Sequence, residues 1–137
     1  MRRVMLIASL VVVSLMNGAC GENSTGPTNA SIAGTYNLQT VSGAALPFVT
    51  SAGNPKSEIV GAQVIVSASG SWNATVNVRI TTGTTVTTQS QGSAGTYTLA
   101  GSIASFKDNA DGSITAVTVS GNTLSATSGG FILVYTK

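Results

Sequence analysis

Side chains that could do acid–base or nucleophilic chemistry are scarce in this 137-residue chain. It contains no histidine, one cysteine, four acidic residues and six basic residues. Without histidine, imidazole general bases, Ser-His-Asp triads and His-ligated metal sites are excluded, and one cysteine cannot form an internal disulfide. No pair of titratable groups is spaced for acid–base work, so we expect no enzyme, no catalytic residue, no metal and no cofactor.

The acidic pair closest to a metal-binding pattern is Asp108 and Asp111, on either side of Asn109 and Ala110. A calcium loop needs more oxygen ligands than this and a closing bidentate Glu, and here Ser113 follows instead. The segment therefore predicts a hairpin turn rather than a metal site.

The leader predicts export. Two arginines at positions 2 and 3 precede an uncharged apolar run at 4–16. That run is too short for the roughly 30 Å hydrocarbon core of a bilayer, and its basic start and small-residue end are typical of a signal peptide. From Cys20 onward four acidic and four basic side chains cancel, so charge predicts no nucleic-acid partner.

The end of the leader, Gly18-Ala19-Cys20, resembles the bacterial lipobox, although Asn17 stands where an apolar residue is usual. The resemblance implies a signal peptide at 1–19 and a lipidated Cys20 that anchors the chain to a membrane. Gly21 in place of Asp implies sorting to the outer membrane, and therefore a location in the bacterial cell envelope. The alternative is ordinary cleavage after Ala19, which leaves a free thiol.

The mature chain divides into a tether and one domain. Residues 20–31 hold the Cys and a run of Gly, Pro and hydroxyl residues, which predicts a flexible tether. Residues 32–137 alternate apolar and polar side chains, most clearly at 71–81, and are rich in Thr and Val, which suit pleated strands. Candidate strands are 34–41, 59–67, 71–81, 84–91, 95–100, 102–107, 113–120, 123–127 and 131–136.

Short Gly- and Asn-rich turns between these strands predict an all-β, antiparallel up-and-down meander. Eight or nine strands in a domain of this size favour closure into a small barrel, with a β-sandwich as the alternative. Ile103 and Phe106 are three residues apart, which breaks the alternation and predicts a bulge between them.

Together, the leader, the tether and two segments resemble the small lipocalin-like lipoproteins of environmental bacteria. The segments are Gly34-Thr35-Tyr36-Asn37-Leu38 and Gly43-Ala44-Ala45-Leu46-Pro47. Tyr36 stands where true lipocalins carry the Trp of a Gly-x-Trp motif. The resemblance implies the barrel fold.

The inward faces of the strands supply the candidate site. An eight-stranded barrel is just wide enough either to fill with side chains or to hold one small ligand. The protein is therefore either a lipid-anchored module that binds a small apolar ligand, or a structural or interaction protein of the cell surface with a filled core. The candidate cavity or core residues are Tyr36, Leu38, Val64, Val66, Trp72, Val76, Val78, Tyr97, Leu99, Phe131, Leu133 and Tyr135.

The segment 44–56 is long for a hairpin loop and carries an apolar cluster of Leu46, Pro47, Phe48 and Val49. Long loops are often functional, and an apolar cluster on a soluble protein is expected to be covered. The cluster is either a plug packed against one barrel end or a lid over a cavity.

Lipidation at Cys20 is tested by Cys20→Ser. We expect the substitution to move the protein from the membrane fraction to the soluble fraction, because the sole acyl acceptor is lost. Fractionation with mass spectrometry of the N-terminal peptide measures this. An unmodified N-terminus together with unchanged fractionation contradicts the prediction.

Overall fold

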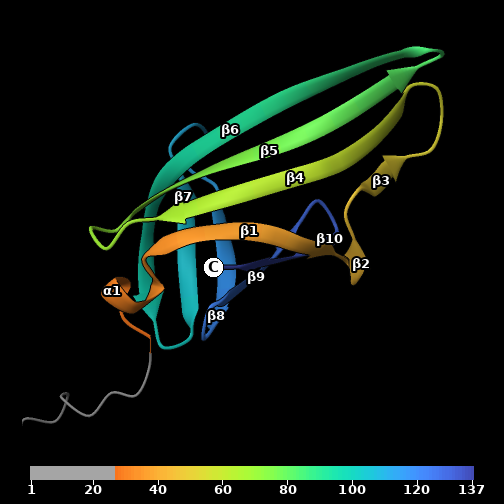
Figure 1. Ribbon diagram of the computed structural model, residues 1–137. Helices are drawn as coiled ribbons and strands as arrows, with labels where there is room; N and C mark the ends of the chain where they lie inside the picture. Colours follow the sequence, from red (N-terminus) through yellow and green to blue (C-terminus); the bar gives the residue numbers. More distant parts are fainter. Residues whose placement is uncertain (1–26) are drawn as a thin grey trace, which may run out of the picture.

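The computed structural model describes residues 27–137, so the predicted leader and Cys20 lie outside the described residues. These residues form one helix of a single turn and ten strands (Figure 1). The elements are α1 (Asn29–Ile32), β1 (Gly34–Val41), β2 (Ala44–Ala45), β3 (Phe48–Ser51), β4 (Lys56–Val66), β5 (Ser71–Thr82), β6 (Thr85–Ala100), β7 (Ile103–Asp108), β8 (Ile114–Ser120), β9 (Thr123–Ser128) and β10 (Phe131–Thr136).

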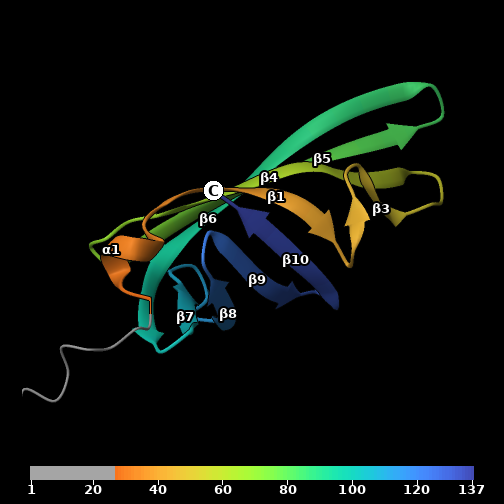
Figure 2. The same ribbon diagram turned by 60° about the horizontal axis from the view of Figure 1, so that its bottom comes forward.

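The strands form one antiparallel sheet in the order β2-β1-β10-β9-β8-β7-β6-β5-β4-β3. An additional pairing of β1 with β4 closes this sheet into a barrel of eight strands, β1 and β4 to β10, while β2 and β3 lie at its margin (Figures 1 and 2). The predicted all-β meander with barrel closure is therefore confirmed, and the sandwich alternative is not adopted.

Two predictions about the strands differ from the structure. The candidate strands 84–91 and 95–100 are one continuous strand, β6. No bulge separates Ile103 from Phe106, because β7 pairs without a register shift on both sides. Ile103 faces outward and is 41% exposed, whereas Ala104 takes the buried position beside Phe106. The alternation of inward and outward side chains in β7 was not recognised in the sequence, because the inward residue Ala104 is small.

One end of the barrel is closed by α1. Thr28 caps this helix, and its Ile32 side chain is 1% exposed. The Tyr36 hydroxyl donates to the Ile32 carbonyl (2.8 Å), and Lys137 Nζ donates to the carbonyl of Ser31 (2.7 Å). The first turn before β1 is thus tied to both the barrel interior and the C-terminal residue. Residues 29–31 belong to α1, although their composition predicts part of a flexible tether.

The barrel wall changes direction at Gly95. From Gly95 onward β6 pairs with β7, whereas residues 85–94 pair only with β5. A Cβ on Gly95 would overlap the Lys107 carbonyl oxygen and lie 2.9 Å from Trp72 Nε1. Only glycine permits this close approach of β6 to β7. On the N-terminal side of Gly95 the β5–β6 hairpin projects from the barrel (Figures 1 and 2), and we call residues 77–94 the arm.

A cluster of charges joins the arm to β4. Glu58, which is 5% exposed, forms ion pairs with Lys56 (2.9 Å) and with Arg79 on β5 (2.8 Å). Hydrogen bonds from Lys56 and then Arg79 hold the pKa of Glu58 below its usual value. The register of β4 shifts between Ile59 and Gly61. Because of this shift, the Glu58 side chain lies on the face of the sheet opposite to that of the buried Ala62 and Val64.

Gly95→Ala tests the close approach in the barrel wall. We expect the free energy of unfolding to fall by about 3 kcal/mol or more, because backbone of two strands must separate to admit the methyl group. Gly92→Ala on the same strand is the control. The nearest atom to its added Cβ is 3.7 Å away, so the change should stay within about 0.5 kcal/mol. Equal effects in urea unfolding contradict this account of Gly95.

Candidate functional site

The barrel interior opens into a cavity of about 300 Å³, which we call the cup. Three of its polar residues, Asp108, Ser113 and Ser128, lie beside the β7–β8 and β9–β10 turns, and these turns are at the barrel end opposite α1. The cup is therefore closed at one end and open at the other. Its lining residues are Trp72, Ala74, Val76, Ser93, Phe106, Asp108, Ser113, Thr115, Val117, Ser128, Leu133 and Tyr135.

Aromatic rings form one wall of the cup. The Trp72 ring stacks on Phe106 with centroids 5.3 Å apart and planes at 27°, and Tyr97 lies behind Phe106 at 5.5 Å. The indole N–H donates to the Thr96 carbonyl (3.1 Å). Trp72 is thus held in place through its polar atom, and its ring supplies apolar surface to the cavity.

The three tyrosines differ in what their hydroxyl groups contact. The Tyr36 and Tyr97 hydroxyls donate to the carbonyls of Ile32 (2.8 Å) and Ser67 (2.6 Å). The Tyr135 hydroxyl makes no hydrogen bond within residues 27–137, and among these residues no fully buried side-chain polar atom lacks a partner. The Tyr135 hydroxyl is therefore exposed to the cup.

Burial raises the pKa of Tyr135 above its ordinary value. Its hydroxyl consequently remains protonated at physiological pH and can donate a hydrogen bond to a bound molecule. Burial, and secondarily the nearby Tyr36, also raises the pKa of Tyr97, whose hydroxyl is already occupied by Ser67.

The rim of the cup is a tight turn held by two carboxylates. Asp108 Oδ1 accepts from the Ala110 amide (2.7 Å), and Asp111 Oδ1 accepts from the Ser113 amide (2.8 Å). Hydrogen bonds from Ser113, first its hydroxyl and then its amide, hold the pKa of Asp111 below the usual value. Both carboxylates stabilise the hairpin turn, and Asp108 also places a carboxylate at the mouth of the cup.

The predicted cavity or core residues divide among three environments, the cup, the core and the arm. Trp72, Val76, Leu133 and Tyr135 line the cup. The others lie elsewhere: Tyr36, Leu38, Val64, Val66 and Tyr97 are buried in the core, Leu99 and Phe131 are half-buried against it, and Val78 is half-buried on the arm. The polar rim was missed, because Ser93, Ser113 and Ser128 resemble ordinary surface serines in the sequence.

The apolar segment expected to act as lid or plug forms β2, β3 and their connection. Phe48 packs edge-on against Phe131 with ring centroids 5.4 Å apart, and Leu46 is half-buried. Pro47 and Val49 are exposed. These four residues do not line the cup. Leu46 instead lines a separate opening of about 460 Å³ in the wall beside β1 and β4.

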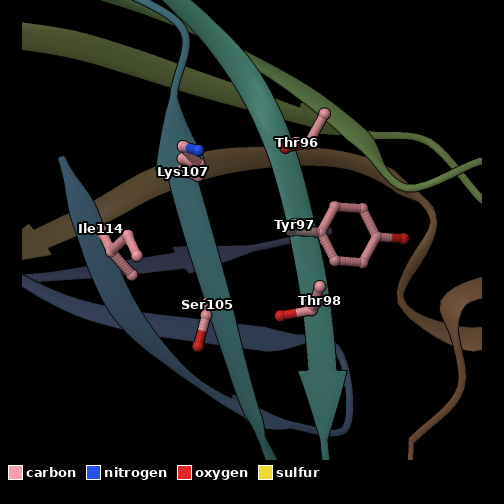
Figure 3. A pocket seen from close by; sticks show the side chains of 6 residues that line it. All are labelled: Thr96, Tyr97, Thr98, Ser105, Lys107 and Ile114. Carbon is pink, nitrogen blue, oxygen red and sulfur yellow. The ribbon is translucent and has the colours of Figure 1, made fainter. Parts of the chain in front are cut away.

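Two other hollows in the described part of the chain are weaker candidates. The wall opening is bordered by amide side chains, and Gln63 Nε2 donates to Asn37 Oδ1 (3.2 Å) within it. The third hollow, about 190 Å³, lies over β6, β7 and β8, where Figure 3 shows the Tyr97 ring turned away from Lys107, Ser105 and Ile114. Of these three hollows, the cup alone combines aromatic walls with polar groups that converge on an interior space, as ligand sites do.

In comparisons with family models, with curated proteins and with solved structures, nothing matches the chain. Within residues 27–137, no helix is both long enough and apolar enough to cross a membrane.

Paired Tyr→Phe substitutions test the assignment of the free hydroxyl. Tyr36→Phe should lower the free energy of unfolding by about 1 kcal/mol, because the buried Ile32 carbonyl loses its donor. Tyr135→Phe should change it by less than about 0.5 kcal/mol, because its hydroxyl makes no hydrogen bond within residues 27–137. Chemical denaturation measures both values, and a larger cost at Tyr135 contradicts the assignment.

Proposed function

We propose that this chain is a cell-envelope lipoprotein of the lipocalin-like type, and that it binds a small, largely apolar molecule in the cup. The single observation that carries the proposal is the one-ended cavity inside the barrel. Its aromatic wall and free Tyr135 hydroxyl are arranged as in binding sites for small molecules.

The cavity constrains the class of ligand. At about 300 Å³ the cup lies at the small end of the range for ligand pockets, so it suits a compact ring system or a short aliphatic chain. One polar group on that molecule can accept a hydrogen bond from Tyr135. Asp108 is the one charged residue of the lining, so a neutral or cationic molecule fits better than an anion.

The anchoring part of the proposal rests on the sequence. The lipobox-like Gly18-Ala19-Cys20 supports acylation of Cys20, and the tether that follows supports display of the barrel at a membrane surface, with the outer membrane as the proposed location. Binding rather than catalysis is proposed, because the residues around the cup offer one carboxylate and no general base paired with it.

A second candidate function, that of an interaction protein of the cell surface, is favoured by the arm. Apart from Ser93 the arm contributes no lining residue to the cup, and it places a long stretch of backbone and polar side chains within reach of another protein. The two functions use different parts of the molecule.

Binding in the cup is tested with phenylnaphthylamine, an uncharged apolar dye that fluoresces when it leaves water. Thr115→Trp places a bulky ring in the mouth of the cup, and we expect it to weaken dye binding by about tenfold or more. Ile114→Trp is the matched control, because the neighbouring Ile114 side chain points outward and is 67% exposed. Its dye affinity should stay within about twofold of wild type.

Equal dye affinity in the two variants contradicts binding in the cup. A loss of affinity in Ile114→Trp alone assigns the dye to the outer hollow over β6, β7 and β8 instead. Both variants are compared with wild type by thermal unfolding, so that a change in affinity is read only from folded protein.

A further inference from the structure

The outer edge of the arm is a long unpaired β-strand edge. Thr82 pairs with Thr85 across a two-residue turn, and the β5–β6 register continues without a shift as far as Ser71 and Thr96. On its other side β6 meets β7 only from Gly95 onward. Within residues 27–137, the segment 85–94 therefore has a neighbouring strand on one side and none on the other, as Figure 2 shows for the projecting hairpin.

The register identifies which backbone groups are free. In a two-residue hairpin the pair that flanks the turn is hydrogen-bonded, so alternate residues from Thr85 direct their N–H and C=O groups toward β5. The intervening residues Val86, Thr88, Ser90 and Gly92 direct theirs toward the open edge. The next such residue, Ala94, agrees with this pattern, because its carbonyl accepts from the Asn109 amide on the β7 side (3.0 Å).

This edge lacks the features with which proteins protect exposed strands. Residues 85–94 read Thr-Val-Thr-Thr-Gln-Ser-Gln-Gly-Ser-Ala, with no charge and no proline, and the pairing with β5 contains no bulge. Natural edge strands usually carry a lysine, a proline or a bulge that prevents pairing with another strand. All ten residues are exposed, so access to the edge is open within the described part of the chain.

We propose that this edge pairs with the same edge of a second copy of the chain, so that two barrels are joined through an antiparallel β6–β6 ladder. A two-fold axis at Gln89 places Val86 opposite Gly92 of the other copy and Thr88 opposite Ser90. This register engages all of the free groups and forms about eight backbone hydrogen bonds.

A second copy fits this edge better than a foreign extended peptide does. Peptides that add to a sheet edge are selected by side-chain pockets or charges next to that edge, and the exposed residues 85–94 provide neither. Self-pairing requires only that the edge complement itself. An uncharged edge meets its own copy without repulsion, and the exposed Val86 side chain faces a glycine that leaves room for it.

Ser90→Pro tests the ladder itself. The Ser90 N–H faces the open edge, so proline removes a donor of the ladder while the β5–β6 hydrogen bonds remain. Ser90→Ala is the control, because it removes the hydroxyl and keeps the N–H. By analytical ultracentrifugation of the purified chain, we expect wild type and Ser90→Ala to be dimers and Ser90→Pro to be a monomer with an unchanged circular dichroism spectrum.

A pair of double variants tests the register and covers the case in which Ser90→Pro does not fold. Thr88→Lys with Ser90→Lys sets like charges opposite each other across the two-fold axis and should abolish the dimer. Thr88→Lys with Ser90→Glu sets opposite charges there and should retain it. A monomeric wild-type chain overturns the proposal, and so does a dimer that persists in both Ser90→Pro and the double-lysine variant.

Discussion

The short seam between β1 and β4 determines the shape of this molecule. Only the residues Gly34–Asn37 of β1 pair with Gln63–Val66 of β4, all near the end of the barrel that α1 covers. Beyond the seam the two strands separate, β1 toward β2 and β4 toward β3, and the register shifts in β1 and β4 lie where they part. The barrel is therefore closed tightly at one end and splayed at the other.

The cup and the arm both follow from this one-sided closure. At the closed end Ile32, Tyr36 and Lys137 fill and fasten the seam, so the interior there is solid core. At the splayed end the interior is not filled by side chains, and the cup lies between the Trp72–Phe106 wall and Tyr135. In the arm, the part of β6 that precedes Gly95 runs with β5 beyond the barrel wall, and no other strand of the described residues covers its outer edge.

The sequence predicted those features that depend on alternation. The inward side chains of β5 and β10, the hairpin turn around Asp108 and Asp111, and closure of a meander all follow from period two and turn chemistry. The joining of two expected strands into β6 could not be predicted, because Gly92 and Gly95 look like turn residues in the sequence. The glycine at position 95 is needed for a different reason, the close packing of β6 against β7. The α1 turn was missed for a related reason: its Asn, Ala and Ser have the composition of a tether, and only the contacts of Ile32 hold it against the barrel.

Binding inside the splayed end of the barrel is the central claim, and nuclear Overhauser contacts between bound phenylnaphthylamine and the labelled chain test it most directly. Our account predicts contacts from the dye to the Trp72 and Tyr135 rings and to the Thr115 methyl group, all of which line the cup. Contacts to Ser105, Lys107 and Ile114 on the outer face, without contacts to the cup residues, would contradict it.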